Sequence, residues 1–423
     1  MILLRSKVSL RPVLGILFLV TLAMARPVGA QDTARARLDS LAEALRLAQA
    51  RLDALEQKVG EATENGVHTR SGTRMELTGR VILQAFGNSG RVNNVDNPQF
   101  ARADAAVPER GGGMSMRQTL LAFRVSSPDV AGAQFAGDLS TDFYGGQLPS
   151  SGGRTFPLIR LRVAKAMLRW SNSELMVGQD VPLIAQLNPV SIAASGTPLF
   201  ATAGNLWLWL PQARVTLGGF RPNTAAIQLA VLAPTSGDPA NTFDTDLDLA
   251  ERTSRPFVET RLRFRWEMSE RPGEIGCGAH VGWILDAATR SEAVACDLVA
   301  PLWMTELRAE AYTGQALKGL GGGGIGQSLT TTQQPVVGVG GWAQLNVNPS
   351  PIWGFGVGCG VDDPDDFELA PAGRLRNASC GAHFVTHPSG PLLLSLEVRR
   401  LVTTYASGQF RVDHLNLGFG FEF

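Results

Sequence analysis

The segment HLNLGFGFEF, residues 414–423, alternates polar or small residues with large apolar ones. Successive residues of a β-strand point to opposite faces, so one face of this strand would carry only apolar side chains. That face would consist of Leu415, Leu417, Phe419, Phe421 and Phe423. In a soluble domain such a row on an edge strand would favour aggregation. We therefore expect this face to contact lipid.

Residues 259–268 show the same two-faced pattern with charges. Glu259, Arg261, Arg263, Arg265 and Glu267 share one face, and apolar residues dominate the other. Segments 160–163, 212–217, 306–311 and 394–399 repeat the pattern. A soluble sandwich would bury the apolar faces, whereas a membrane barrel places them in lipid and turns the charged faces toward an aqueous lumen. Together with the final strand, the repetition favours an all-β fold, a closed antiparallel transmembrane β-barrel, over a soluble β protein.

Turn signals divide the barrel region, residues 76–423, into about sixteen strands, an even number as in other single-chain bacterial barrels. Short connections rich in Pro, Gly, Ser and Asn predict periplasmic turns at 127–129, 171–173, 221–223, 271–273, 348–350 and 387–390. Longer segments such as 87–114, 180–208, 234–254, 315–334 and 361–376 predict external loops. Under strict alternation Lys165 and Arg169 point away from Arg160 and Arg162, which indicates a β-bulge in that strand.

The residues ahead of the barrel predict export and association. Residues 1–30 combine a basic start, a short apolar run and a small-residue cleavage site, as in a signal peptide. A single anchoring helix is the alternative, but the run is shorter than the ~20 apolar residues that span a bilayer. Residues 31–62 repeat apolar residues at spacings of three and four, which predicts a short periplasmic coiled-coil helix. A solitary amphipathic helix on the barrel would show the same pattern. Residues 63–75 form the predicted linker.

The composition of the chain limits the kinds of partner that it is expected to bind. The chain has 423 residues and a formal net charge of zero, so no nucleic-acid partner is expected, because phosphate binding needs a concentrated basic face. After residue 30 no stretch predicts a transmembrane helix. Export and apolar strand faces indicate the bacterial outer membrane, with the N-terminal helix in the periplasm. The expected partners are outer-membrane lipid and the barrel-assembly machinery, whose recognition signal the phenylalanine-ended final strand resembles.

Strand parity also assigns the residues that would line the channel. The basic ones are Arg124, Arg160, Arg162, Arg214, Arg261, Arg263, Arg265, Arg308 and Arg399, and the acidic ones are Asp138, Asp142, Glu259, Glu306, Glu310 and Glu397. Guanidinium groups stay charged at any relevant pH and donate forked hydrogen bonds to carboxylates and phosphates. The wall therefore predicts a preference for small anionic solutes, although ion pairs without any preference would have the same composition.

The segment 180–208 is the candidate constriction. It contains Pro182, Pro189 and Pro198, and it is too apolar to lie comfortably in water. Folding into the barrel would bury its apolar side chains. An external cap or a contact between subunits would explain the same composition.

Four cysteines in an exported chain allow disulfides. Cys277 could stand opposite Cys296 in a hairpin, and Cys359 could stand opposite Cys380 across loop 361–376. The repeated Cys-Gly-Ala-His at 277–280 and 380–383 does not predict a metal site, because residues three apart on a strand face opposite sides. The acidic segments 244–248 and 362–366 could bind calcium, but solvated surface loops are the simpler account. No serine nucleophile motif accompanies the five histidines, so neither an enzyme nor a cofactor site is predicted.

Three pieces of residues 77–217 resemble the DcaP-like outer-membrane porins. They are Arg117-Gln118 with the Ser127-Pro128 turn and Asp142-Phe143, then 159–164 with 175–179, and finally 210–216. The resemblance implies a homotrimeric porin that favours small anions such as dicarboxylates. The chain departs from the family at 180–182, at Leu120 and at 164–166, all near the pore wall. A non-conducting barrel anchor or adhesin, or an outer-membrane barrel enzyme, would be the alternatives.

Overall fold

The computed structural model describes residues 67–68, 72–103, 110–145, 157–238, 246–268, 270–286, 288–366 and 369–423. These residues belong to one compact unit, Val67–Phe423. The predicted signal peptide at 1–30, the predicted coiled coil at 31–62 and most of the predicted linker lie outside the described residues. Among the described residues, no helix has the length and hydropathy that a membrane-spanning helix requires.

The unit is built almost entirely of antiparallel strands. β1 (Val67–His68) is a two-residue strand paired with the start of β2. β3 and β4 both pair with β2, at Gln84–Asn88 and at Arg74–Arg80, so they share one position in the wall. Counting them once, sixteen strands form the wall, and the predicted number is confirmed. The strands are β2 (Arg74–Asn88), β3 (Gly111–Ser115), β4 (Leu120–Val130), β5 (Ala133–Gly145), β6 (Leu158–Arg169), β7 (Ser173–Asp180), β8 (Leu210–Gly218), β9 (Thr224–Leu232), β10 (Phe257–Met268), β11 (Arg271–Trp283), β12 (Arg290–Leu302), β13 (Thr305–Gln315), β14 (Val337–Ser350), β15 (Trp353–Pro364), β16 (Arg374–Thr386), β17 (Leu392–Tyr405) and β18 (Gly408–Glu422).

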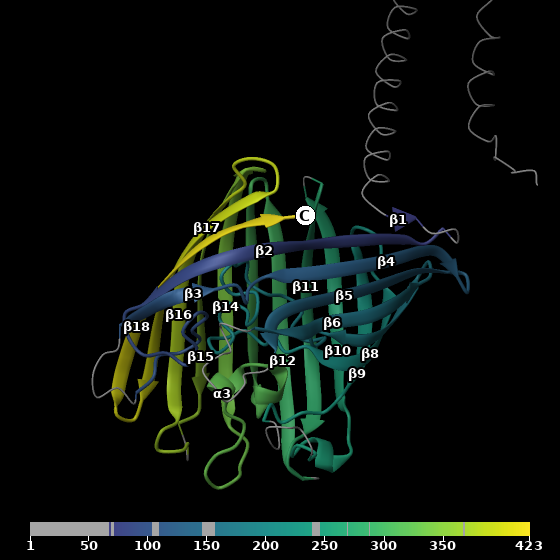
Figure 1. Ribbon diagram of the computed structural model, residues 1–423. Coiled ribbons are helices and arrows are strands. Elements are labelled where there is room, and N and C mark those ends of the chain that lie inside the picture. The colour runs from purple at the N-terminus through teal and green to yellow at the C-terminus, as the bar shows by residue number, and fades with distance from the viewer. Residues whose placement is uncertain are drawn as a thin grey trace, which may run out of the picture. The chain divides into compact units, whose positions relative to one another are not determined.

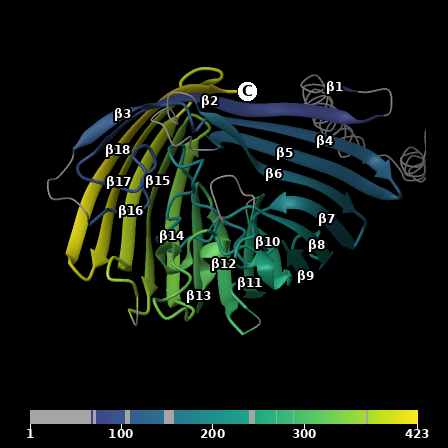
Figure 2. The same ribbon diagram turned by 60° about the horizontal axis from the view of Figure 1, so that its bottom comes forward.

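Each strand pairs with its neighbours in sequence, and the sheet closes on itself. β9 pairs with β10, and β18 pairs with β2 from His414 opposite Asn88 to Glu422 opposite Arg80. Beyond the last register pair, Phe423 and Gly79 exchange two backbone hydrogen bonds of 2.9 and 3.0 Å. Closure leaves no open edge between the first and last barrel strands, which satisfies their backbone groups without water. Figures 1 and 2 show the wall curving around to bring yellow β18 beside purple β2.

The two faces of the wall decide between a soluble and a membrane fold. On β18, Leu417 is 50% exposed and Phe419 is 59% exposed, whereas Asn416 and His414 on the opposite face are 0% and 3% exposed. The same arrangement holds on β10, where Leu262 is 63% exposed and Arg261 is 2% exposed. A soluble protein buries such apolar faces, and a continuous apolar outer surface marks contact with lipid. The apolar faces are therefore outside, and the polar and charged faces point into the barrel.

All the long connections lie at one end of the barrel, together with the two-residue turn 406–407, and the other connections, of two to five residues, lie at the opposite end. The turn end carries the connections 131–132, 170–172, 219–223, 269–270, 303–304, 351–352 and 387–391, and the loop end carries 89–110, 146–157, 181–209, 233–256, 284–289, 316–336, 365–373 and 406–407. The predicted turns at 171–173, 221–223 and 387–390 coincide with real turns. Those predicted at 127–129, 271–273 and 348–350 are wrong by a few residues, because strand pairing continues through them. Bulges at Ser127/Val130 and Val347/Ser350 accommodate the prolines in two of the three.

The predicted bulge in β6 is confirmed. Val163 pairs with Ser140 and Leu161 pairs with Thr141, so Arg162 is the extra residue between them. The inserted residue reverses the parity of the strand. As a result Lys165, which contacts Asp180 at 2.9 Å, faces the same way as Arg160.

Candidate functional site

The connection between β7 and β8, residues 181–209, folds into the barrel and is held there by carboxylates of the wall. Glu397 of β17 accepts hydrogen bonds from the Ser191 hydroxyl at 2.6 Å and from the backbone N–H groups of Ile192 at 2.5 Å and Ala193 at 2.8 Å. Glu259 of β10 accepts N–H bonds from Leu183 at 2.5 Å and Ile184 at 3.3 Å. Ionised acceptors make such bonds stronger than neutral ones. We call residues 181–209 the inner loop.

Amide side chains hold the inner loop on other strands. Gln344 of β14 bonds both backbone groups of Val190, at 2.7 and 2.9 Å. Asn377 of β16 donates to the Thr202 carbonyl at 2.8 Å, and Gln118, just before β4, accepts from the Gly196 N–H at 2.7 Å. The inner loop therefore reaches both sides of the enclosed space. The interpretation that this segment folds inward agrees with the structure, and an external cap does not.

Glycines on the inner face make room for the inner loop. A Cβ atom on Gly360 would lie 2.1 Å from the Ala203 carbonyl oxygen, and one on Gly278 would lie 3.0 Å from a methyl carbon of Ile184. Side chains at these wall positions would push the inner loop away from the strands. Along its course the loop packs Leu183, Ile184 and Leu206 into an apolar cluster with residues of β8, β9, β10, β12, β13 and the 316–336 connection. This cluster fills part of the barrel interior.

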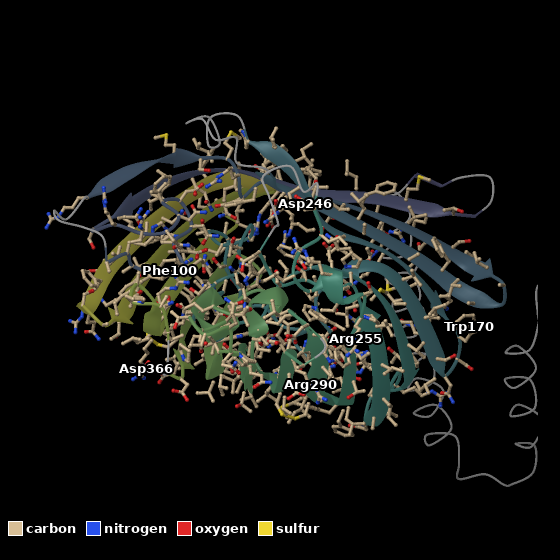
Figure 3. All side chains as sticks on the ribbon, turned by 90° about the horizontal axis from the view of Figure 1, so that it is seen from below. Phe100, Trp170, Asp246, Arg255, Arg290 and Asp366 are labelled. Carbon is tan, nitrogen blue, oxygen red and sulfur yellow. A yellow bond between two sulfur atoms is a disulfide. The ribbon has the colours of Figure 1, made fainter. Side chains whose placement is uncertain are left out.

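Two other long connections also pack inward at the loop end. In the 89–110 connection, Asp96 forms a buried ion pair with Arg117, whose Nε lies 2.9 Å from the carboxylate, and the Pro98 carbonyl accepts a bond from Arg399 at 2.7 Å. In the 316–336 connection, the Ile325 N–H donates to Asp362 at 3.1 Å. Figure 3, a view from the loop end, shows side chains crowding the space within the wall. The interior at this end is therefore narrowed by several segments.

Arginines gather where the inner loop approaches β2 and β6. Arg160 makes a forked contact with Asp142, at 3.1 and 2.6 Å, and also donates to the Gly196 carbonyl. Arg162 lies 3.6 Å from Asp142, and Arg80 donates to the Ser195 hydroxyl. Arg162 interacts electrostatically with both Arg80 and Arg160. We call the group Arg80, Arg160, Arg162 and Asp142 the arginine cluster. In it Arg160 and Arg162 share the Asp142 carboxylate, whereas the carboxylates that act on Arg80 are Glu397 and Glu422.

Two side chains of the arginine cluster are partly exposed. The Nε atoms of Arg80 and Arg162 are buried and have no hydrogen-bond partner in the described part of the chain. The Arg160 and Arg162 side chains are 28% and 16% exposed. The guanidinium carbon of Arg162 lies 4.7 Å from the ring centroid of Trp209, which keeps its plane aligned by cation–π contact. This arrangement can offer forked N–H groups to a passing carboxylate or phosphate.

All fifteen residues expected to line the channel face inward, but their accessibility differs. Arg124, Arg160, Arg265 and Arg308 have side chains 28–60% exposed. By contrast Glu259, Arg261 and Glu310 are 0–2% exposed. The remaining positions are Asp138, Asp142, Arg162, Arg214, Arg263, Glu306, Glu397 and Arg399. Strand parity finds the inward side of each residue but not the inner loop that covers several of them, because the covering segment lies far away in sequence.

The arginines on the inner face of β10 differ in their ion pairing. Arg261 contacts Asp297 at 2.6 Å and Glu274 at 2.8 Å, and Arg265 contacts Glu274 at 2.6 Å. Arg263 between them forms no ion pair with a described carboxylate, and its guanidinium donates to the Gly219 carbonyl at 3.3 Å. Most of this row is therefore neutralised within the wall. In the arginine cluster, by comparison, two guanidinium groups share one carboxylate, that of Asp142.

The cysteines lie on the outer face of the wall. Cys277 is bonded to Cys296 across β11 and β12, and Cys359 is bonded to Cys380 across β15 and β16. Cys277 is exposed outward while His280 points inward and is 1% exposed. Within the described residues, no group of three or more His, Cys, Asp and Glu side chains is arranged to hold a metal ion.

One hydrogen-bond chain of catalytic type was missed by the sequence reasoning. His280 Nδ1 lies 2.9 Å from Glu259, and its Nε2 lies 3.2 Å from the Ser291 hydroxyl. The order resembles a serine–histidine–acid triad. However, Ser291 is 2% exposed, and Glu259 is already occupied by the inner-loop N–H groups. A nucleophile needs access to substrate, so this chain of bonds stabilises the interior. No local sequence motif predicts this hydrogen-bond chain, because its three residues are brought together only by the pairing of β10, β11 and β12.

Comparison with known proteins identifies the architecture. No protein-family model and no curated protein sequence matches the chain. Its structure is similar to the outer-membrane channel DcaP of Acinetobacter baumannii, with a TM-score of 0.64, 15% identity, and coverage of 85% of this chain and 99% of that one. It is also similar to an anion-selective porin from Comamonas acidovorans, with a TM-score of 0.57, 10% identity, and coverage of 83% of this chain and 100% of that one. For Salmonella typhi OmpF the TM-score is 0.53 and the identity 8%, with coverage of 85% of this chain and 100% of that one. This chain therefore has the sixteen-stranded barrel fold of the outer-membrane porins.

Proposed function

We propose that this protein is an outer-membrane diffusion channel for small hydrophilic solutes and that it prefers anions. The observation that carries the proposal is the arginine cluster, in which Arg160 and Arg162 share the single carboxylate of Asp142 at the inner loop. A positive excess in a narrow channel lowers the barrier for anions and raises it for cations. The anion-selective porin among the similar structures supports this direction.

The chemistry of the cluster favours carboxylate or phosphate solutes. Guanidinium groups bind planar carboxylates through two parallel hydrogen bonds, and the Arg160 and Arg162 side chains are 28% and 16% exposed. Dicarboxylates, which the resemblance to DcaP-like porins implies, could contact two of the three guanidinium groups at once. Passage requires that such contacts remain weak enough for release.

Reversal potential in a planar bilayer tests the proposal. The purified protein is inserted into a neutral bilayer with a tenfold potassium chloride gradient. Anion selectivity gives a reversal potential with the same sign as the chloride equilibrium potential. Addition of succinate at one side should reduce the chloride current by competition. A reversal potential indicating cation preference would overturn the proposed selectivity, while the proposed channel activity would stand.

Assembly forms part of the proposal. We take residues 1–30 as the signal peptide, residues 31–62 as the periplasmic coiled-coil helix and 63–75 as the linker to the barrel, with three copies forming a homotrimer. About four heptads give limited stability on their own, so the barrels would hold the helices together. Light scattering of the detergent-solubilised full chain measures its oligomeric state. The same measurement on a variant lacking residues 31–62 measures how far the helix stabilises the oligomer. A trimer that loses stability without the helix is expected, and a monomeric full chain would contradict it.

A non-conducting barrel anchor is the second candidate, and the inward packing of three connections favours it. The apolar cluster around Leu183 and Ile184 excludes water from part of the interior. Single-channel recording separates the two candidates, because a plugged barrel gives no stepwise conductance. A barrel hydrolase would instead react at Ser291. A fluorophosphonate probe should leave the folded protein unlabelled, since that hydroxyl is buried.

A further inference from the structure

Both disulfides lie at mid-height on the lipid-facing side of the wall. Cys277 and Cys296 are each the seventh residue of a thirteen-residue strand, β11 and β12, and all four cysteines are exposed on the outer face. Cys359 is the seventh of twelve residues in β15, and Cys380 is the seventh of thirteen in β16. Each disulfide therefore joins the middle of one strand to the middle of its hairpin partner.

Charged and aromatic side chains mark the borders of the apolar band around these disulfides. At the loop end, four residues from the nearest cysteine in each case, lie Glu292 of β12 and the Arg376–Asp363 ion pair. At the turn end, again four residues away, the rings of Phe355 and Phe384 contact each other across β15 and β16, with centroids 5.1 Å apart. Such rings collect at membrane–water interfaces. Four residues of a tilted strand rise by about 10 Å, which is the depth of the sulfur atoms below either border.

The first disulfide has the same surroundings as the second. At the turn end the Trp266 ring covers Gly273, four residues from Cys277, since a Cβ atom on Gly273 would lie 2.2 Å from that ring. Ile275 and Val294, each two residues from a cysteine on the same outer face, are 45% and 54% exposed. Apolar side chains exposed at this height contact lipid. Hydrocarbon therefore surrounds both disulfides in the inserted barrel.

Formation of a disulfide by exchange needs a thiolate in water. The thiolate attacks a disulfide sulfur of the oxidant and forms a mixed disulfide, and the second thiolate of the pair then releases the oxidant as a dithiol. Two cysteine thiols thus lose two protons and two electrons, which the oxidant's disulfide gains. A charged group is unfavourable at the centre of a bilayer. The inserted barrel therefore keeps its cysteines from this reaction, and a water-soluble protein oxidant does not reach them.

The spacing of the cysteines favours the correct pairs even in an unfolded chain. The two disulfides have sequence separations of 19 and 21 residues. Pairing Cys277 with Cys359 and Cys296 with Cys380 would give 82 and 84, and the third arrangement would give 103 and 63. The probability of closing a loop falls with about the 3/2 power of its length, so each native pair is favoured about eightfold over those of 82 and 84 residues. Native pairing therefore does not require the folded barrel.

We propose that both disulfides form before the barrel enters the membrane, and that the unfolded exported chain is a substrate of a water-soluble protein oxidant with a reactive disulfide. Insertion then encloses both disulfides in hydrocarbon, out of reach of water-soluble oxidants and reductants. Each disulfide fixes one hairpin, β11–β12 or β15–β16, before the other strands assemble. The inference rests on the membrane location of the barrel and is independent of conductance.

Pulse–chase labelling of the full chain in exporting cells tests the order of the two events. Free thiols are blocked with a maleimide, disulfides are read by gel mobility with and without reduction, and insertion is read by heat-modifiable migration. We expect oxidised chains to appear first in the fraction that is not heat-modifiable. Reduced chains that become heat-modifiable and are oxidised afterwards overturn the proposal. Cells without their exported thiol oxidases should accumulate reduced chain, and oxidation at the normal rate in them overturns the assignment of the oxidant.

Reduction of the inserted barrel tests the enclosure by lipid. A control variant moves the first disulfide six residues toward the loop end, by Trp283→Cys and Arg290→Cys in a Cys277→Ser, Cys296→Ser chain. Trp283 and Arg290 are register partners, as the native pair is. The control keeps the β15–β16 disulfide, so both rates are measured in one molecule, and heat-modifiable migration checks its folding.

In liposomes a water-soluble phosphine should reduce the β15–β16 disulfide on the order of a hundredfold more slowly than the one at the loop end, because the thiolate that leaves is charged. In urea, where lipid no longer covers the chain, the two rates should be similar. Equal rates in liposomes overturn the proposal, since both disulfides would then be in contact with water.

Discussion

Replacing Arg162 with glutamine should reverse much of the anion preference without unfolding the barrel. The contact of Arg162 with Asp142, at 3.6 Å, is longer than the forked contact of Arg160, which reaches 2.6 Å. Because the substitution leaves the Arg160 contact in place, Asp142 does not become an unpaired buried charge. For a solute at about 5 Å, Coulomb's law with water-like screening gives about 0.8 kcal/mol per charge. The substitution removes this attraction for an anion and the same repulsion for a cation. The anion-to-cation permeability ratio should therefore fall about fifteenfold.

Reversal potentials at about 0.1 M salt, where screening extends over ~10 Å, measure this ratio. Arg124→Gln is the matched control. Its side chain also faces inward, but it is 60% exposed at the turn end, so solvent screens it and the ratio should change by less than about threefold. An unchanged reversal potential in Arg162→Gln would refute the assignment of selectivity to the arginine cluster. An equally large shift in Arg124→Gln would show that selectivity is spread along the whole wall.

Three further outcomes are expected. Glu397→Gln keeps the shape of the side chain but weakens its three hydrogen bonds to the inner loop, at a total cost of about 2 kcal/mol. Hydrogen exchange at the Ile192 and Ala193 amides should therefore accelerate, and single-channel current should become noisier. Unchanged exchange would contradict the anchoring role of Glu397. The variant Cys277→Ser, Cys296→Ser opens a crosslink with a sequence separation of 19 and should lose about 3 kcal/mol in reversible urea unfolding, and reduction of the unmodified chain should add four hydrogens to its intact mass. Gly360→Val should displace the inner loop and alter conductance, because its Cβ atom would lie 2.1 Å from the Ala203 carbonyl, while Gly87→Val, with open space around its Cβ atom, should not; equal conductance of the two variants would argue against the packing described.

The barrel and the two faces of its wall follow from local sequence. Alternation at 414–423 and 259–268 assigns each side chain to a face, because the strand period is two regardless of what the strand packs against. The bulge at Arg162 was visible for the same reason: Lys165 and Arg169 break the parity that Arg160 begins. The two cysteine pairs could be placed opposite each other because a hairpin relates residues at equal distances from its turn.

The contents of the barrel were decided only by the tertiary structure. Parity places Glu259, Glu397 and Arg162 on the inner face, but it does not show that the first two hold inner-loop N–H groups while the third keeps an unpartnered donor. Those contacts join segments as far apart as Ile192 and Glu397, and the burial of each charge depends on both. Period-two alternation is a local property of the backbone, whereas a site depends on which distant segments fill the same space.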